Sequence, residues 1–105
     1  MAKLPHAALL KQAYRMDAVS LHNSLMRSSD HELAIVFLHL GDREKDYFLS
    51  VLSPEKKRRV ENLLARLSHV LIPYDIYKEA VKLLIMRLGG ENPPPLPQYY
   101  RPNRS

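Results

Sequence analysis

The sequence predicts an all-α fold, and three observations on its 105 residues support that prediction. Hydrophobic residues make up 46% of the chain, which is enough for a packed core and too many for a fully disordered chain. The three glycines and the three prolines that precede the C-terminal tail fall at the edges of a few segments and leave the stretches between them uninterrupted. Those stretches follow the helical period of 3.6 residues. A chain of this length forms one domain, which we place at residues 1–90.

The first half of the chain is expected to form two helices. The first runs from about residue 5 to residue 27, because Pro5 is favoured at the start of a helix and no Pro or Gly follows it. Ser29 and Glu32 have the spacing of a capping box, which opens a second helix that continues to Leu40. That helix is apolar on nearly all sides, so we expect it to be central and buried.

The second half is expected to form three more helices. After Gly41, Asp42 is the expected cap of a third, short helix. Ser53 caps a fourth, with Pro54 as its first residue. Its apolar positions follow the 3,4 spacing of an amphipathic helix at Val60, Leu63, Leu64, Leu67 and Leu71.

A fifth helix is expected from Pro73 to Leu88, where Gly89 and Gly90 end it. The fold class is therefore four to five short helices joined by connections of one to three residues. Such sharp connections are typical of an armadillo-like, right-handed helical layer. Residues 91–105 carry five of the eight prolines, and we expect this Pro-rich C-terminal tail to be disordered or extended.

Several classes of function are not supported by the composition. The chain has no cysteine and three glycines, so thiolate catalysis, cysteine-based zinc sites and glycine-rich phosphate loops have no residues to form from. Five histidines are present without a local spacing that would gather metal ligands, and they are interpreted as surface or interface residues. We expect no catalytic residues, no cofactor and no metal, and therefore no enzyme. The chain has neither a secretory signal nor a long apolar run, so we expect a cytoplasmic protein.

A basic cluster, residues Lys56, Lys57, Arg58 and Arg59, contributes most of the formal net charge of +5. Nucleic-acid binding by a small basic regulator is therefore the alternative function. Consecutive helical residues point about 100° apart, however, so these four side chains do not form one stripe along the helix. The favoured interpretation is a solvated helix start in which Glu55 pairs with Arg59.

The fifth helix carries an apolar face wider than one neighbouring helix would cover. Ile76, Ala80, Leu83 and Leu84 form one stripe, and Tyr77, Val81 and Ile85 flank it. A domain of about 90 residues has little core to cover both sides of a terminal helix. The sequence therefore predicts that Tyr77, Val81 and Ile85 form a partner-binding surface for an apolar helix of another protein or of a second copy.

Residues 31–88 resemble one helical unit of the flagellar motor switch protein FliG family. The likeness lies in the apolar run from Leu33 to Leu40 closed by Gly41 and Asp42, and in the stretch from Phe48 to Glu55 with its Leu-Ser-Pro-Glu helix start. It continues through Leu63-Leu64-Ala65-Arg66-Leu67 into the last helix. The Glu-His-Pro-Gln-Arg motif of the family's middle domain is absent.

The resemblance implies an armadillo-like unit that works by protein–protein contact in motility. It implies a component or accessory of the flagellar rotor and switch assembly, at the cytoplasmic face of the basal body. The implied partner is a helical segment, such as that of a basal-body ring protein, or a second copy of the chain.

Overall fold

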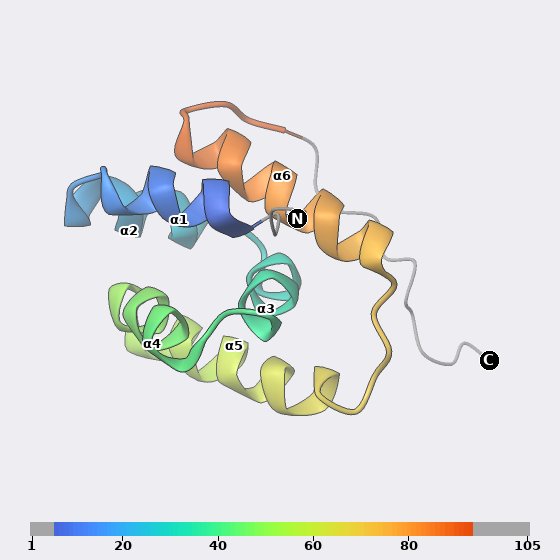
Figure 1. Cartoon of the computed structure of the whole chain (residues 1–105). Helices are drawn as coiled ribbons and strands as arrows, with labels where there is room; N and C mark the ends of the chain where they lie inside the picture. The colour runs from blue at the N-terminus through green and yellow to red at the C-terminus, as the bar shows by residue number, and fades with distance from the viewer. Residues whose placement is uncertain (1–5, 94–105) are drawn as a thin grey trace.

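The computed structural model describes residues 6–93, which form six α-helices and no strand (Figure 1). The helices are α1 (His6–Tyr14), α2 (Ala18–Arg27), α3 (Asp30–Leu38), α4 (Asp42–Val51), α5 (Pro54–Leu67) and α6 (Tyr74–Leu88). The expected all-α class is confirmed for these residues. The Pro-rich tail from residue 94 onward lies outside the described residues.

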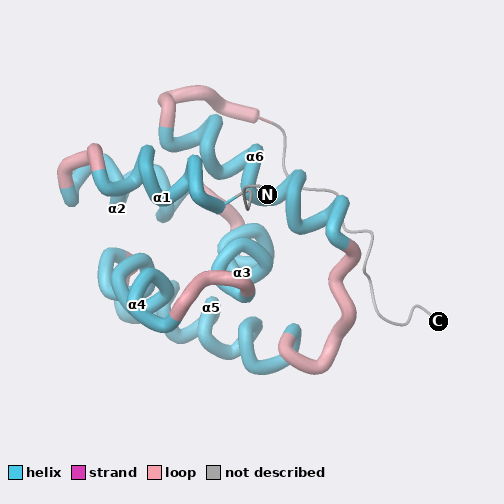
Figure 2. Tube along the Cα trace, viewed as in Figure 1, coloured by secondary structure: helices cyan, strands magenta, loops and turns pink. Residues whose placement is uncertain are grey.

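Helix α3 is the centre of the molecule. Figures 1 and 2 show it between α1, α2 and α6 on one side and α4 and α5 on the other, and it packs on both α5 and α6. All residues from Leu33 to Phe37 are fully buried, as the lack of an amphipathic pattern predicted. The rings of Phe37 and Phe48 stack with their centroids 5.4 Å apart, which joins α3 to α4.

The expected first helix is in fact two helices, which makes six where four to five were expected. The helix breaks between Tyr14 and Ala18 because Asp17 caps α2. Its carboxylate accepts hydrogen bonds from the Ser20 amide at 3.1 Å and the Ser20 hydroxyl at 2.9 Å. This local pairing competes with a continuous helix, although neither Pro nor Gly is present.

Two of the predicted caps are confirmed and one is wrong. The Ser29 and Ser53 hydroxyls accept hydrogen bonds from backbone amides at the starts of α3 and α5. Gly41, and not Asp42, is the N-cap of α4, so Asp42 is already a helical residue. It lies in the first turn, where a negative charge favours the helix dipole.

The fourth expected helix ends earlier than its apolar pattern suggested. Helix α5 stops at Leu67, and Leu71 lies in the loop that follows with 93% of its surface exposed. The 3,4 spacing of Leu71 therefore did not reflect a buried position. The chain from residue 68 to residue 73 forms the open connection to α6 (Figure 2).

The end of α6 turns the chain back on itself. Gly90 has a φ of 93°, and the amides of Gly90 and Glu91 donate to the carbonyls of Arg87 and Met86 at 3.0 and 2.9 Å. This is the Schellman arrangement, in which a glycine adopts the left-handed conformation that other residues disfavour.

Candidate partner-binding surface

The predicted partner-binding residues on α6 are mostly part of the core. Tyr77 and Val81 keep only 4% and 1% of their surface exposed, while Ile85 is half-buried. The expectation that the three form an exposed flank is therefore wrong for Tyr77 and Val81. The physical reason is that α1 packs along α6 on this side, so a small domain does cover this wide face.

The basic cluster is a solvated helix start only in part, because Lys57, Arg58 and Arg59 are exposed but Lys56 is buried. The Lys56 ammonium is buried and donates to the Ser28 carbonyl and to Asp30 Oδ1, both at 2.8 Å. The Arg59 guanidinium donates to Asp30 Oδ2 at 2.8 Å and thus pairs with Asp30, where Glu55 was expected. Only Lys57 and Arg58 of the cluster are exposed without an ion pair in the described part of the chain.

The charge network around Asp30 fixes the start of α5 against the turn between α2 and α3. Partial burial alone would raise the pKa of the Asp30 carboxyl, but the hydrogen bonds from Lys56 and Arg59 outweigh it and lower that pKa below its ordinary value. The network is therefore structural. It also engages Lys56 and Arg59 in ion pairs that contact with a phosphate would have to compete with.

A second acidic residue of α3 forms a fully buried ion pair. Glu32 Oε2 accepts a hydrogen bond from the Arg87 guanidinium, and both side chains are almost inaccessible. Glu32 Oε1 is buried without a hydrogen-bond partner among residues 6–93. Burial raises the pKa of the Glu32 carboxyl, although Arg87 acts in the opposite direction.

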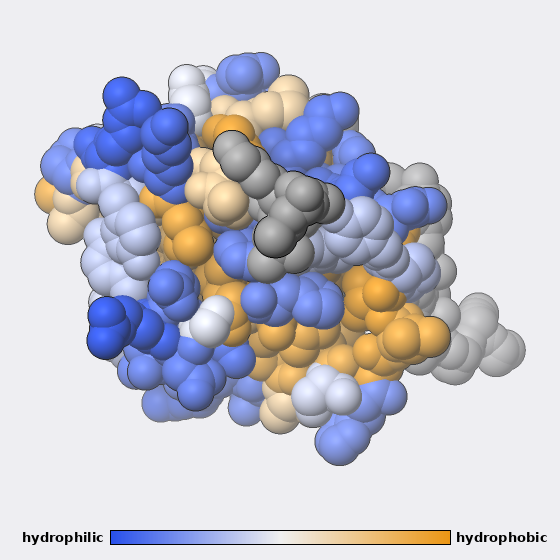
Figure 3. Space-filling model, in the orientation of Figure 1, coloured by the Kyte–Doolittle hydropathy of each residue, from blue (hydrophilic) through white to orange (hydrophobic). Residues whose placement is uncertain are grey.

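The loop between α5 and α6 and the first residue of α6 carry three exposed apolar side chains that lie close together in the sequence. Leu71 is 93% exposed, Val70 38% and Tyr74 56%. We call these three residues the apolar rim. Figure 3 shows apolar surface gathered over this loop and the adjoining part of α5. Single exposed apolar residues are ordinary, but a contiguous group of them marks an interaction surface.

A cavity of about 390 Å³ opens beside the apolar rim. We call it the aromatic pocket, and its lining residues are His6, His39, Ile72, Tyr74 and Tyr77. They come from the start of α1, the end of α3, the α5–α6 loop and the first turns of α6.

The aromatic pocket is held together by contacts to Tyr77. The Tyr77 hydroxyl and His6 Nδ1 lie 2.9 Å apart and share a hydrogen bond. The His39 ring stands edge-on to the Tyr77 ring at a centroid distance of 4.4 Å, and the Tyr74 ring follows at 6.1 Å. Burial, with a smaller effect of Tyr74, raises the pKa of the Tyr77 hydroxyl. Tyr77 therefore supports the pocket as a neutral aromatic side chain.

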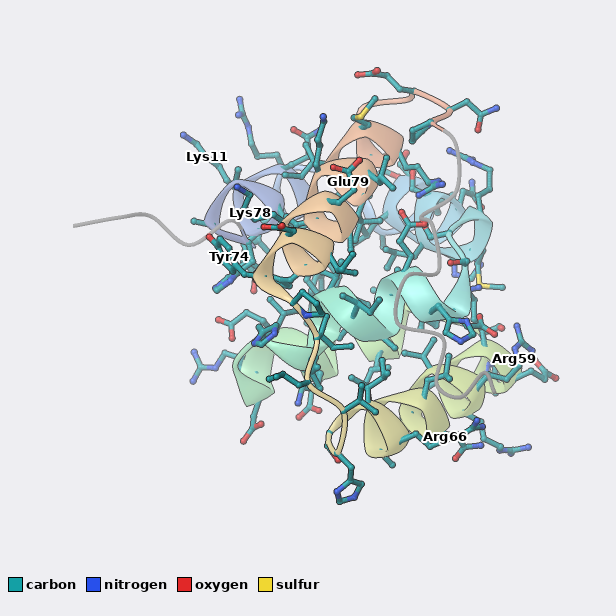
Figure 4. The ribbon with its side chains drawn as sticks, turned by 90° about the vertical axis from the view of Figure 1, so that its right-hand side faces the viewer. Lys11, Arg59, Arg66, Tyr74, Lys78 and Glu79 are labelled. Atoms are coloured by element: carbon teal, nitrogen blue, oxygen red, sulfur yellow. The ribbon has the colours of Figure 1, made fainter. Side chains whose placement is uncertain are left out.

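Two shallower depressions lie elsewhere on the described surface. One, of about 640 Å³, follows the outer side of α6 and mixes acidic and basic side chains over Val81 and Ile85. Figure 4 shows Tyr74 and Lys78 on successive turns there, and the Lys78 ammonium lies 5.5 Å from the Tyr74 ring centroid. The other, of about 470 Å³, lies between α2 and α4 and includes the exposed Val19.

The described residues hold no group of three or more side chains that could bind a metal ion. Within the same residues, no helix is both long and apolar enough to cross a membrane.

The chain has no match among protein-family models, curated proteins or solved structures. The resemblance to the FliG family therefore stays a prediction from the sequence.

Sequence reasoning missed both the aromatic pocket and the buried ion pair. The pocket joins residues as far apart as His6 and Tyr77, for which no local pattern exists. The ion pair had a weak signal, since Arg87 interrupts the apolar stripe that ends with Leu83, Leu84 and Leu88. A charged residue in such a stripe needs a buried partner.

Proposed function

We propose that this chain is a non-enzymatic protein–protein interaction module whose partner docks on the apolar rim. The observation that carries the proposal is the exposure of Leu71 between Val70 and Tyr74, at the edge of a concave aromatic surface. Full burial of a leucine side chain contributes about 1.5–3 kcal/mol, so a partner that covers Leu71 gains substantial affinity from one residue. A few central residues carry most of the affinity of an interface, and tyrosine, here Tyr74, is enriched among them.

The partner that fits this surface is an apolar helical segment of another protein. The rim is carried by a loop and the first turn of a helix, so it offers side chains but no unpaired strand edge for β-augmentation. The sequence resemblance gives the proposal its finer form. In that form the chain is an armadillo-like unit at the cytoplasmic face of the flagellar basal body, and its partner is a rotor or ring component. The short connections from α3 to α4 and from α4 to α5 support such a unit.

A matched pair of substitutions tests the role of the rim. Leu71→Ser and Val19→Ser each replace an exposed apolar residue by serine, on the α5–α6 loop and at the start of α2 respectively. Leu71→Ser should weaken binding to the co-purified and then reconstituted partner at least about tenfold, which is about 1.4 kcal/mol. Val19→Ser should leave that affinity unchanged. Equal effects of the two substitutions would contradict the proposal.

The same variants also test self-association. Light scattering of the full chain over a range of concentrations reports whether a second copy is the partner. A dimer that Leu71→Ser dissociates would show that the rim binds another copy of the chain, and the proposed heterologous partner would then be wrong.

The alternative function, nucleic-acid binding, receives less support from the observed contacts. Lys56 and Arg59 are already paired with Asp30, which leaves Lys57 and Arg58 as the exposed cations of the cluster that form no ion pair among residues 6–93. Affinity for a phosphate backbone grows with the number of phosphates neutralised, so two cations contribute little.

A further inference from the structure

The aromatic pocket has the chemistry of a site for an extended, uncharged peptide. Tyr74, Tyr77 and His39 present rings, Ile72 adds an aliphatic wall, and no carboxylate, lysine or arginine of the described residues lines it. Grooves lined by aromatic side chains accept proline rings and aromatic side chains of peptides in the polyproline II conformation. Such peptides lose little conformational entropy on binding because the extended helix is preformed.

The chain itself contains a segment of this composition. Residues 93–100 read Pro-Pro-Pro-Leu-Pro-Gln-Tyr-Tyr, with four prolines and two adjacent tyrosines. This is the most proline-rich stretch of the sequence. Its tyrosines are suited to offset or edge-on contacts with Tyr74 and His39, which are favourable by about 0.5–1.5 kcal/mol per aromatic pair.

The described residues place the start of this segment beside the last turn of α6. The Schellman arrangement at Gly90 reverses the chain, and the Pro93 carbonyl lies 3.5 Å from the Arg87 guanidinium. The same guanidinium binds Glu32, near the beginning of α3. The aromatic pocket lies at the other end of the same α3–α6 contact, where His39 meets Tyr77.

The distance along α6 matches the length of the segment. From the level of Arg87 to the level of Tyr74 the helix rises by about 20 Å, at 1.5 Å per residue. A polyproline II segment advances about 3.1 Å per residue, so the seven residues from 94 to 100 span about 22 Å. An extended segment that followed α6 would therefore be long enough to bring Tyr99 and Tyr100 to the level of the aromatic pocket.

We propose that the proline- and tyrosine-rich segment, residues 94–100, binds the aromatic pocket of its own molecule, with Tyr99 and Tyr100 as the anchors. A short tether that can span the distance gives an effective concentration on the order of millimolar, so even a weak peptide contact is populated. The segment then covers the surface next to the apolar rim, and a ligand with a stronger aromatic anchor competes with it.

A paramagnetic label tests this proposal in the full chain. The protein has no native cysteine, so Asn103→Cys gives one attachment site for a nitroxide, close to the two tyrosines. NMR relaxation enhancement should be strongest at the amides of His39, Ile72 and Tyr74. The matched control carries the same label with Tyr99→Ser and Tyr100→Ser, which changes no residue of α1 to α6. We expect its occupancy of the pocket to fall about tenfold, as the loss of two aromatic contacts implies.

Two further measurements decide the remaining outcomes. Tyr74→Ser removes an exposed wall of the pocket and should reduce the enhancement at His39 and Ile72 without changing distant amide shifts. A sample of labelled unenriched protein mixed with unlabelled ¹⁵N protein should show no enhancement at the pocket. Enhancement in the mixed sample would show that the segment binds a second copy, which overturns the proposal. Enhancement that is uniform over the surface, or unchanged by the tyrosine substitutions, overturns it as well.

Discussion

Two acidic residues in the first turn of α3, Asp30 and Glu32, differ in burial, in ion-pair partners and in the direction of their pKa shifts. Asp30 lies at the edge of the molecule with 24% of its side chain exposed, and two cations of α5 bind it. Glu32 lies fully inside and is bound by Arg87 of α6 alone. The pKa of Asp30 is lowered and the pKa of Glu32 is raised.

The surroundings of the two carboxyl groups, and not their positions in the helix, set their pKa values. Both carboxylates lie near the positive end of the α3 dipole, which favours the charged form of each. Asp30 gains two charged hydrogen-bond donors and keeps contact with water, whereas Glu32 loses water and gains one donor. Together they tie the beginning of α3 to α5 and α6, while its other end, at His39, borders the open aromatic pocket.

Breaking the buried ion pair should have the largest effect. Arg87→Met keeps much of the arginine's apolar stem but leaves the Glu32 carboxylate buried without a cation. Removing one partner of a buried pair typically costs about 3–5 kcal/mol. Urea unfolding followed by circular dichroism at pH 7 measures this loss. The loss should shrink at acid pH, where Glu32 becomes protonated.

The double variant Glu32→Met with Arg87→Met is the control for that substitution. It removes both charges and fills the space with apolar side chains, so it should recover most of the stability that Arg87→Met loses. If the double variant is as unstable as the single one, packing of the arginine stem and not the charge pair holds α3 to α6.

Breaking the ion-pair network at Asp30 should cost less stability. Substitution of two neighbouring lysines, Lys56 and Lys57, measures this cost. Lys56→Met removes the ammonium that donates to Asp30 and to the Ser28 carbonyl. We expect a loss of about 1–3 kcal/mol, the usual cost of leaving a partly buried hydrogen-bonding group unpaired. Lys57→Met, one residue later and exposed, should change the free energy of unfolding by less than about 0.5 kcal/mol. Equal losses in the two variants would show that the Asp30 network contributes no stability.

The two carboxylates should also respond to pH in opposite directions. The pKa of Asp30 is lower in the folded chain, so its contribution is present above the unfolded pKa and is lost as the pH falls through the folded pKa. The pKa of Glu32 is higher in the folded chain, so stability falls as the pH rises from the unfolded pKa through the folded one. Free energies of unfolding measured between pH 3 and pH 7 in the wild type, Asp30→Asn and Glu32→Gln separate the two. Asp30→Asn should remove the acid-side loss, and Glu32→Gln the decline at higher pH. A Glu32→Gln profile parallel to the wild type would mean that Arg87 keeps the folded pKa of Glu32 at its ordinary value.

The features that could be predicted from the sequence depend on contacts between residues close together in the chain. Ser29, Ser53 and Gly89 act through hydrogen bonds within a few residues, and the helix ends that they predicted are where the structure has them. The break at Asp17 was missed although it too is local, because Asp-x-x-Ser is a weaker signal than Pro or Gly.

The features that could not be predicted from the sequence depend on contacts between residues far apart in the chain. Glu32 has the spacing of a capping box, yet its carboxylate binds Arg87, 55 residues later. Tyr77 and Val81 lie beside the main apolar stripe of the helix, where we expected a partner to bind, yet both are buried because α1 packs against α6. Helical periodicity indicates that a face is apolar, and it leaves open which helix or partner covers it.

The smallest effect on stability is expected for Lys57 and Arg58, the two residues of the basic cluster that do not pair with Asp30. Lys57→Gln with Arg58→Gln removes two exposed charges that form no ion pair among the described residues, so the free energy of unfolding should stay within about 0.5 kcal/mol of the wild type. The same variant tests the alternative function, because a nucleic-acid site would need these two cations. Titration of the wild type with single- and double-stranded oligonucleotides at low and physiological salt should detect no specific binding that the variant lacks. Binding that weakens steeply with salt and disappears in the variant would identify Lys57 and Arg58 as phosphate contacts. In that case Asp30 would hold Lys56 and Arg59 next to Lys57 and Arg58. The whole basic cluster would then belong to a nucleic-acid site, and the purely structural role of the Asp30 network would be wrong.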